Sequence, residues 1–379
     1  METGTRTTAS NANDHLLDIE EGIHYLNPRH NGIRFVKKLL ENGRNGKDKT
    51  AKSYKHEWHE TSLPPRRETV TIAAGAVTLT VANSSVYPIG TMLRIDNEMI
   101  EVTARPSGTT LTVLRARLGT ADVIHTASVA LNLGYAGEEY GTGPEALSTN
   151  AVQLYNYVQT FEAAVEMSDK EIAQLSSEIG NPFSAQLERV TAFFWKTFAQ
   201  SVFKGVRGST TRNGRPVHYM GGIDGYLTTN VVNVGGAVST TVIDTNLILP
   251  LVVAGGTPDV IVMSPKKFLQ ISALDTAAVR ITKDETTGGN PIYKKWQSAA
   301  SEQDLDLITD HSILDTEMYV LDTSKLAILP LENNGISGRL ALVDGTTTGA
   351  SGKRRILRAH YTLVVELEAG HAKAINLTA

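Results

Sequence analysis

The sequence contains no cysteine among its 379 residues. Disulfide bonds, thiol nucleophiles, zinc ribbons and cysteine-ligated iron–sulfur clusters are therefore excluded. Aromatic residues make up only 6% of the chain, which leaves little material for the exposed aromatic platforms of a carbohydrate-binding protein. No apolar run approaches the roughly 20 residues of a membrane-spanning helix, and the N-terminus lacks the apolar stretch of a secretory signal. These absences favour a soluble intracellular protein.

Charge is present but unevenly distributed. Residues 1–28 carry one basic and five acidic side chains, a balance of −4, whereas residues 29–67 carry eleven basic and four acidic ones, a balance of +7. A basic stretch is usually a solvated arm; the alternative is a segment that contacts a polyanion or the acidic surface of a neighbouring subunit. No DNA-reading motif accompanies it, so sequence-specific recognition is not expected. The basic side chains considered for this contact are Arg29, Arg34, Lys37, Lys38, Arg44, Lys47, Lys49, Lys52 and Lys55.

A short amphipathic segment lies inside this basic stretch, at residues 33–40. It is too short to be stable alone, because a single short helix does not offset its nucleation cost. We therefore expect it to dock, and a neighbouring subunit can cover its apolar face. The side chains expected to dock are Ile33, Phe35, Val36, Leu39 and Leu40.

Residues 66–135 differ from the arm, because apolar and polar residues alternate there with a period of two. Turn residues separate the alternating runs at intervals of roughly 8–12 residues, which is typical of an all-β module. The polar flanks indicate an insertion into a larger protein. The predicted strands are 69–72, 78–81, 92–95, 99–102 and 110–113.

The strongest helical signal lies at residues 182–206. Asn181 provides an N-cap and Pro182 the first helical residue, and glycine follows the last periodic position at Gly205. At 1.5 Å per residue, a helix of this length is roughly 36 Å long. Apolar side chains that recur every three to four residues form its expected core face: Phe183, Leu187, Val190, Phe194, Phe198 and Val202.

Residues around and after this helix alternate between helix and strand patterns. Before it, residues 155–167 alternate like a strand, and Ser168 with Glu171 forms a capping box for a short helix. After it, a helix is predicted at 241–253, and another begins at Ser264–Pro265 and continues to residue 274. Further strands are predicted at 259–263, 304–309, 317–321, 326–329, 356–367 and 372–377. This pattern predicts an α+β fold with a mixed or antiparallel sheet rather than a regular parallel repeat.

Motifs for catalysis and metal binding fail on their spacing. His56 and His59 are three residues apart, whereas the metalloprotease helix motif requires histidines four apart. Residues 349–354 resemble a phosphate-binding loop, but Thr347 and Arg354 occupy positions that require glycine and Ser or Thr. No GxSxG nucleophile elbow occurs. One remaining cluster could bind a cation but is explained more simply as the polar face of a strand: Asp304, Asp306, Asp310 and His311.

Four stretches of sequence carry a family resemblance. They are YPIG through RIDNE and LTVLR within residues 87–115, NYVQTF with VEMS within 156–168, MGGIDGYL at 220–227, and YTLVVE with HAKA within 361–374. Their order across residues 66–379 is more specific than any one of them. The chain resembles the major capsid protein of tailed double-stranded DNA bacteriophages, in the branch whose extended loop carries a small β-domain.

The resemblance implies a shell subunit without an active site, metal or cofactor. It assigns residues 1–54 to an N-terminal arm, 55–150 to the extended loop, 151–220 with 345–379 to a peripheral domain, and 221–344 to an axial domain. It implies hexamers and pentamers of an icosahedral shell in the virion, assembled in the host bacterial cytoplasm and facing packaged DNA through non-specific charge. Portal, scaffolding and decoration proteins are the further partners, and no membrane is involved. Because only residues 1–28 precede the basic arm, scaffolding is expected to be a separate protein or minimal.

Two other classes remain as alternatives. A phage tail-tube or decoration protein is also β-rich, but it has no need of the long helix or of the α+β region. A hydrolase needs a catalytic constellation that the motif search does not find. On the capsid interpretation, deletion of residues 29–55 is expected to abolish particle assembly and to leave a folded monomer.

Overall fold

The computed structural model divides the chain into two compact units. Unit 1 comprises residues 1–57 and 155–379, and unit 2 comprises residues 58–154. The two-stranded sheet of β1 (Lys55–Glu60) and β8 (Val152–Tyr157) contains the points where the chain passes from one unit to the other. The residues that the structure describes are 34–45, 50–61, 66–137, 139, 141, 143, 145, 151–173, 182–274, 279–282, 293–298, 300–301, 303–333, 336–347, 349 and 351–378.

Unit 2 is an antiparallel sheet of six strands in the order β2-β7-β4-β5-β6-β3. The alternation in the sequence produces it, because every second side chain faces the core that contains Leu93, Ile100 and Leu111. The predicted all-β module and its five strands are confirmed, and β7 is added to them. The strands are β2 (Arg67–Ile72), β3 (Thr78–Thr80), β4 (Thr91–Ile95), β5 (Glu98–Ser107), β6 (Thr110–Leu114) and β7 (His125–Tyr135), with short 3-10 turns at Ser84–Val86 and Arg117–Gly119.

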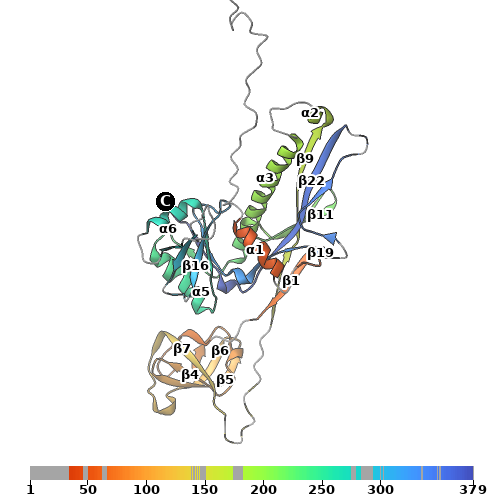
Figure 1. Cartoon of the computed structure of the whole chain (residues 1–379). Helices are drawn as coiled ribbons and strands as arrows, with labels where there is room; N and C mark the ends of the chain where they lie inside the picture. The colour runs from red at the N-terminus through yellow and green to blue at the C-terminus, as the bar shows by residue number, and fades with distance from the viewer. Residues whose placement is uncertain are drawn as a thin grey trace, which may run out of the picture. The chain divides into compact units, whose positions relative to one another are not determined.

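In unit 1, a long helix packs on a long strand pair (Figure 1). The helix is α3 (Pro182–Lys204), as the spacing predicts, and the predicted N-cap Asn181 lies outside the described residues. Beside it, β9 (Gln159–Ser168) pairs antiparallel with β22 (Gly352–Val365) along its whole length, from Gln159 opposite Tyr361 to Ser168 opposite Gly352. Strand β18 (Leu326–Pro330) pairs with residues 361–365 of β22, and β21 (Ala341–Asp344) pairs with residues 355–358, on the opposite edge of β22 from β9. The short helix predicted before α3 is α2 (Asp169–Ala173), and the Ser168 hydroxyl accepts a hydrogen bond from the Glu171 amide at 3.3 Å.

The rest of unit 1 is built on a seven-stranded mixed sheet in the order β12-β23-β17-β13-β16-β15-β14. The β12–β23 and β13–β16 pairs are parallel and the others are antiparallel. The α+β fold with a mixed sheet is therefore confirmed. The strands are β12 (Val231–Asn233), β13 (Val260–Met263), β14 (Val279–Thr282), β15 (Tyr293–Gln297), β16 (Asp304–Thr309), β17 (Met318–Leu321) and β23 (Ala372–Ile375).

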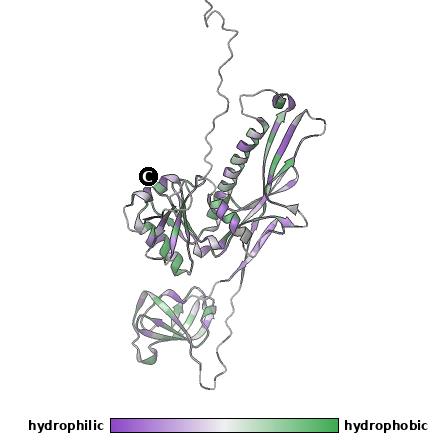
Figure 2. Ribbon diagram, viewed as in Figure 1, coloured by the Kyte–Doolittle hydropathy of each residue, from purple (hydrophilic) through white to green (hydrophobic). Residues whose placement is uncertain are grey.

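Helices and hairpins complete unit 1. The helix predicted at 241–253 is a π-helical segment (Val242–Ile248) that continues into α5 (Leu249–Val253), which is mostly hydrophobic in Figure 2. Ser264 caps α6 (Pro265–Ala273) as predicted, because its side chain accepts a hydrogen bond from the Lys267 amide. The remaining elements are α1 (Arg34–Asn45), α4 (Ile223–Tyr226), and the strand pairs β10 (Gly208–Arg212) with β11 (Arg215–Tyr219) and β19 (Glu332–Asn333) with β20 (Ile336–Ser337).

Candidate assembly surfaces and buried charge clusters

Two of the stretches that resembled metal sites can be placed in the structure. His56 and His59 lie on β1, an extended strand rather than a helix. Asp304 lies exposed on β16, whereas Asp310 is fully buried after its end, so the acidic residues of this region do not converge. Among the residues that the structure describes, no group of histidine and acidic side chains could hold a metal ion. In the same described part of the chain, no helix is long and apolar enough to cross a membrane.

The arm helix α1 docks within its own chain. Phe35, Val36 and Leu39 are at most 1% exposed, and Leu40 packs against the same core. The Phe35 ring stacks on Phe203 of α3, with ring centroids 5.4 Å apart. The expected docking of these side chains therefore occurs within the chain, where α3 and the sheet behind it supply the surface, and a neighbouring subunit is not needed to cover them. Ile33 lies outside the described residues.

This docking also corrects the expected effect of a deletion. Removal of residues 29–55 takes three fully buried side chains of α1 out of the core, and each such loss costs several kcal/mol. The deletion should therefore destabilise unit 1 itself, and it does not separate assembly from folding.

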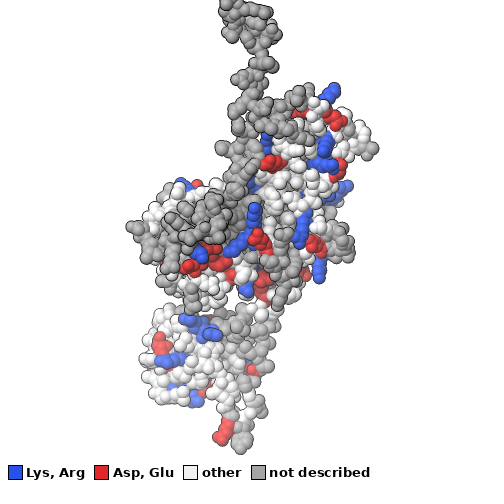
Figure 3. Space-filling model, viewed as in Figure 1, with Lys and Arg blue, Asp and Glu red and all other residues white. Residues whose placement is uncertain are grey.

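The basic residues of the arm are not all available to a partner. The Lys38 ammonium is 2.9 Å from the Asp259 carboxylate, and Lys55 forms an ion pair with Glu57 and lies 4.1 Å from the centre of the Tyr155 ring. Lys37 and Lys52 are exposed. The side chains of Arg34 and Arg44 are outside the description, as are the whole residues Arg29, Lys47 and Lys49. On the face of unit 1 shown in Figure 3, basic and acidic side chains are interspersed.

The buried face of α3 carries the apolar residues that the three- to four-residue spacing predicts. Phe183, Phe194, Phe198 and Val202 are at most 4% exposed, while Leu187 and Val190 are partly buried against the same core. Phe198 packs edge-on against Phe161 of β9 at a centroid distance of 4.9 Å. Phe193, which lies off this face, is 66% exposed.

The end of α3 is packed closely against the GGI segment that follows the β10–β11 hairpin. The Gly222 amide donates to the Gly205 carbonyl at 2.8 Å, and a Cβ on either glycine would lie within 2.7 Å of backbone atoms. The fully buried Asn156 of β8 ties this junction to the sheet. Its amide nitrogen donates to the carbonyls of Gly221 and Leu363, and its oxygen accepts from the Gly221 amide at 2.8 Å.

A cluster of charges lies beside this junction, which we call the junction cluster: Lys204, Asp224, Glu317, Tyr319 and Lys373. Lys204 donates to Asp224 at 3.2 Å and to Glu317 at 2.6 Å, and Lys373 donates to Asp224 at 2.9 Å. The Tyr319 hydroxyl donates to Glu317 at 2.9 Å. Burial acts to raise the pKa of Asp224, but the two ammonium groups overcome it and hold that pKa below its usual value. The cluster therefore joins α3, α4, β17 and β23.

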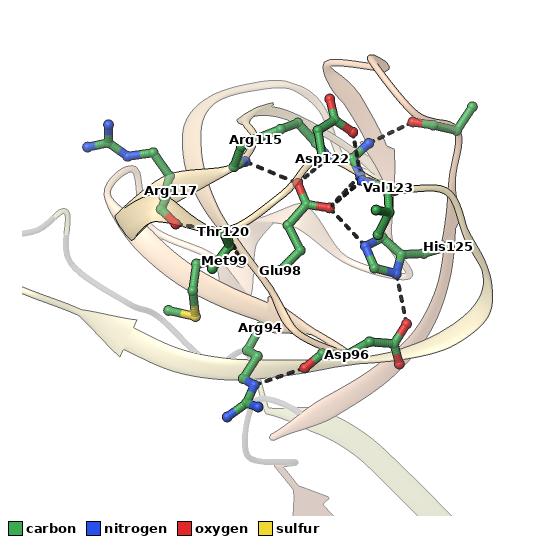
Figure 4. Close-up of polar contacts among 12 residues, drawn as sticks. Arg94, Asp96, Glu98, Met99, Arg115, Arg117, Thr120, Asp122, Val123 and His125 are labelled. Carbon is green, nitrogen blue, oxygen red and sulfur yellow. Dashed lines mark hydrogen bonds and ion pairs between the residues drawn. The ribbon is translucent and has the colours of Figure 1, made fainter.

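A second cluster, which we call the Glu98 cluster, has a buried centre in unit 2 and comprises Asp96, Glu98, Arg115, Asp122 and His125 (Figure 4). The side chains of Glu98, Arg115 and His125 are at most 5% exposed. Arg115 donates two hydrogen bonds to the Glu98 carboxylate, at 2.8 and 2.6 Å, and His125 lies 2.9 Å from it. Burial acts to raise the pKa of Glu98, but the hydrogen bonds from Arg115 and His125 outweigh it and lower the pKa to about 2.

The same cluster extends to the chain around it. Asp96 is 2.8 Å from the other ring nitrogen of His125, and Asp122 is 2.9 Å from Arg115. Arg115 also donates to the Ala73 carbonyl at 2.6 Å. The motif search missed these residues. A signal was present, because Glu98 is in phase with the inward-facing Ile100 and Val102, which places a charge in the core.

Comparison with known families identifies the chain. A model of the SU10 major capsid protein family matches residues 1–378. The chain belongs to the SU10 major capsid protein family. It is therefore a capsid shell protein, and the resemblance inferred from the order of its segments is confirmed. No curated protein matches the chain in a sequence comparison.

Solved structures of shell proteins are similar to this family member at low sequence identity. The capsid asymmetric unit of cyanophage A-1(L) is 14% identical, covers 64% of this chain and 85% of its own, and has a TM-score of 0.45. The structure of Mycobacterium phage Patience is 10% identical over 76% of this chain and 80% of its own, with a TM-score of 0.40. The SrpI encapsulin of Synechococcus elongatus is 12% identical over 60% and 78%, with a TM-score of 0.44.

Proposed function

We propose that this capsid protein assembles with copies of itself into hexamers and pentamers, and that these close an icosahedral shell around the packaged double-stranded DNA of a tailed bacteriophage. The family match over residues 1–378 carries this proposal. The chain acts as a structural subunit and not as a catalyst, consistent with motifs that fail on spacing. Its place is the shell of the virion, with assembly in the host cytoplasm.

Two parts of unit 1 suit two different domains of a shell subunit, a peripheral domain and an axial domain. The helix α3 on the β9–β22 pair forms a continuous framework suited to the peripheral domain, at residues 151–220 and 345–379. Residues 221–344 contribute most of the seven-stranded sheet with its own core, which suits an axial domain around a capsomer centre. Heterologous contacts that close into rings generate large shells from a single chain.

The remaining parts are assigned on the same basis. Residues 1–54 form the arm, and residues 55–150 form the extended loop that carries the β insertion of unit 2. Exposed basic residues of the arm, such as Lys37, face neighbouring subunits or packaged DNA without sequence preference. Portal, scaffolding and decoration proteins are the further partners of the shell.

The test is the assembly state of the purified chain. The full chain is expressed in bacteria, and sedimentation and negative-stain electron microscopy follow. Closed particles of uniform size, with hexameric and pentameric capsomers in class averages, are the expected result. A stable monomer of 40.9 kDa under all assembly conditions would contradict self-assembly, and open tubes would indicate a tail-tube protein instead.

A further inference from the structure

The part of unit 1 that contains most of α3 and the β10–β11 hairpin has no acidic residue. Residues 189–223 carry six basic side chains and no aspartate or glutamate, although the whole chain has 40 acidic residues among 379. A local excess of one sign attracts a partner of the opposite charge. Three of the six are exposed, at the base and the tip of the hairpin, and we call them the hairpin arginines: Arg207, Arg212 and Arg215.

The hairpin arginines have no carboxylate partner among the described residues. Three other partly exposed arginines of unit 1 each pair with a carboxylate: Arg339 with Glu332, Arg355 with Asp344, and Arg358 with Glu162. The positive charge of the hairpin is therefore not balanced by its own chain, and it is open to an anionic partner.

Two of the hairpin arginines lie at the tip, on neighbouring strands. Arg212 is directly opposite Arg215 in the register, and Asn213 and Gly214 between them have positive φ values of 51° and 73°, as a two-residue hairpin turn requires. Directly opposite residues point to the same side of a hairpin, and like charges at such positions are destabilising. The pair therefore lowers the stability of the free hairpin, and a bound anion would remove the repulsion.

The other side of the hairpin is fixed to unit 1 by aromatic contacts. His218 stacks on Tyr157 at a centroid distance of 5.2 Å, and its ring centroid lies 5.1 Å from that of Tyr54. At the base, the Arg207 guanidinium donates to the Tyr155 carbonyl at 2.8 Å and lies 4.2 Å from the centre of the Tyr155 ring. Because alternate residues of a strand face opposite sides, the docked side carries His218 and the two tip arginines lie on the outward side.

The chemistry of the outward side fits DNA better than a protein surface. Residues 207–220 are all described, and no large hydrophobic side chain among them is exposed, whereas the centre of a protein interface is usually apolar. Protein–DNA interfaces are polar and positively charged, and a two-stranded ribbon is narrow enough to enter the major groove. Arginine also matches phosphate oxygens with two parallel hydrogen bonds. The Tyr219 hydroxyl lies on the same side and accepts a hydrogen bond from Arg212 at 3.2 Å.

We propose that the β10–β11 hairpin binds the phosphate backbone of the packaged double-stranded DNA through Arg212 and Arg215, with Arg207 as a further cation at its base. The contact is made without sequence preference, because phosphate contacts carry no sequence information. The inference rests on the proposed function, since a shell around DNA brings the hairpin to this ligand, and it names a defined surface for that contact. Lys38 and Lys55 of the arm, by contrast, are already paired with carboxylates.

The test is the affinity of the unassembled full chain for a short fluorescein-labelled DNA duplex, measured by fluorescence anisotropy over a salt series. Arg212→Gln combined with Arg215→Gln should weaken binding roughly tenfold at low salt. The slope of the logarithm of the association constant against the logarithm of the salt concentration should become shallower by about 2, because two phosphate contacts are lost. Lysine at both positions should keep most of that slope, because an ammonium group also neutralises phosphate.

A matched control separates the hairpin from net charge. Arg355→Gln combined with Arg358→Gln removes the same charge from unit 1, but these arginines are already paired, so the affinity and the salt slope should stay close to those of the wild type. The hairpin variant should unfold at the same or a slightly higher temperature than the wild type, because it loses a like-charge pair. Unchanged affinity and salt slope in the hairpin variant, or an equal loss in the control, would overturn the proposal.

Closed shells test which surface of the assembly the hairpin occupies. Duplex added to intact empty shells should not reach the hairpin, so any residual binding should be the same with and without the two arginines. Binding to intact shells that depends on Arg212 and Arg215 would place the hairpin on the outside and reject packaged DNA as its ligand. Failure of the wild-type chain to form shells would reject the proposed self-assembly, and it would not alter the affinities measured on the unassembled chain.

Discussion

The two units of this capsid protein use charged side chains in different ways. In unit 2, the Glu98 cluster draws its residues from one stretch, 96–125, and its three central side chains are at most 5% exposed. In unit 1, the junction cluster joins residues as distant as Lys204 and Lys373, and Lys204 and Asp224 remain about one-third exposed, at 30% and 32%. The small β module thus depends on one buried charge network to fix a loop, whereas the larger unit uses partly solvated charges to connect elements that its apolar cores already hold.

The largest loss of stability should come from Glu98→Gln. The change leaves the buried Arg115 with only the partly exposed Asp122 as a carboxylate partner, and breaking a buried pair costs about 3–5 kcal/mol. Hydrogen exchange of the full chain, resolved by peptide, should show faster exchange in β5 and β6 with little change in unit 1. Asp96→Asn is the matched control, because Asp96 is 60% exposed at the edge of the same cluster and its loss should matter much less. Unchanged protection of β5 and β6 would show that the network does not stabilise unit 2.

The two units should also differ in how acid changes their stability, because a different carboxylate, Asp310, titrates in unit 1. Asp310 in unit 1 is fully buried, and its Oδ2 atom has no hydrogen-bond partner among the described residues. Burial raises its pKa from 3.8 to about 6, although a hydrogen bond from the Ser312 amide acts in the opposite sense. Because the folded-state pKa lies above the unfolded value, the native state binds a proton first, and this residue adds stability as the pH falls through about 6 toward 3.8.

The measurement is the difference in thermal stability between the wild type and Asp310→Asn at several pH values. The wild type should gain relative to the variant between about pH 7 and pH 5. A difference is needed because burial lowers the pKa of His371 in the same unit, and His371 therefore costs stability as the pH falls below its ordinary value of 6.5. A constant difference between the two proteins across this range would contradict the role assigned to Asp310.

Glu98 supplies the contrast in unit 2. Its folded-state pKa of about 2 lies below the unfolded value of 4.5, so its stabilising contribution is present above pH 4.5 and is lost as the pH falls toward 2. Protection of β5 and β6 should therefore be unaffected by the titration of Asp310 and should fall only in stronger acid.

Much of the fold could be predicted from local pattern, because local chemistry determines it. The spacing of α3 and the alternation of β2 to β6 depend on neighbouring residues alone. The strand β7 was missed because its outward positions carry Val129, Leu131 and Leu133 while the inward ones include Ala130 and Asn132, which reverses the usual pattern. The β10–β11 hairpin was missed although its Asn213–Gly214 turn is a strong hairpin signal, because the flanking strands are polar on both faces.

The site could be predicted less well than the fold. The docking of Phe35 on Phe203 joins segments 168 positions apart (203 − 35), and no local pattern determines which surface covers an amphipathic helix. The Glu98 cluster depends on the pairing of β5 with β6, which brings Glu98 and Arg115 together from inward-facing positions. An acidic and a basic residue at inward-facing positions of two neighbouring strands are a sequence signal for such a buried ion pair.

The smallest loss of stability should come from the junction cluster, and its size can be compared directly with that of the Glu98 cluster. A double-mutant cycle with Lys204→Met and Glu317→Gln isolates the coupling between these two side chains. Because Lys204 is 30% exposed and Glu317 is 13% exposed, water screens the pair, and we expect about 1 kcal/mol or less from denaturant unfolding. The same cycle with Glu98→Gln and Arg115→Met should give a coupling several times larger. If the two couplings were equal, burial would not be what separates the clusters, and the long-range connection made by Lys204 would be as important to unit 1 as the Glu98 network is to unit 2.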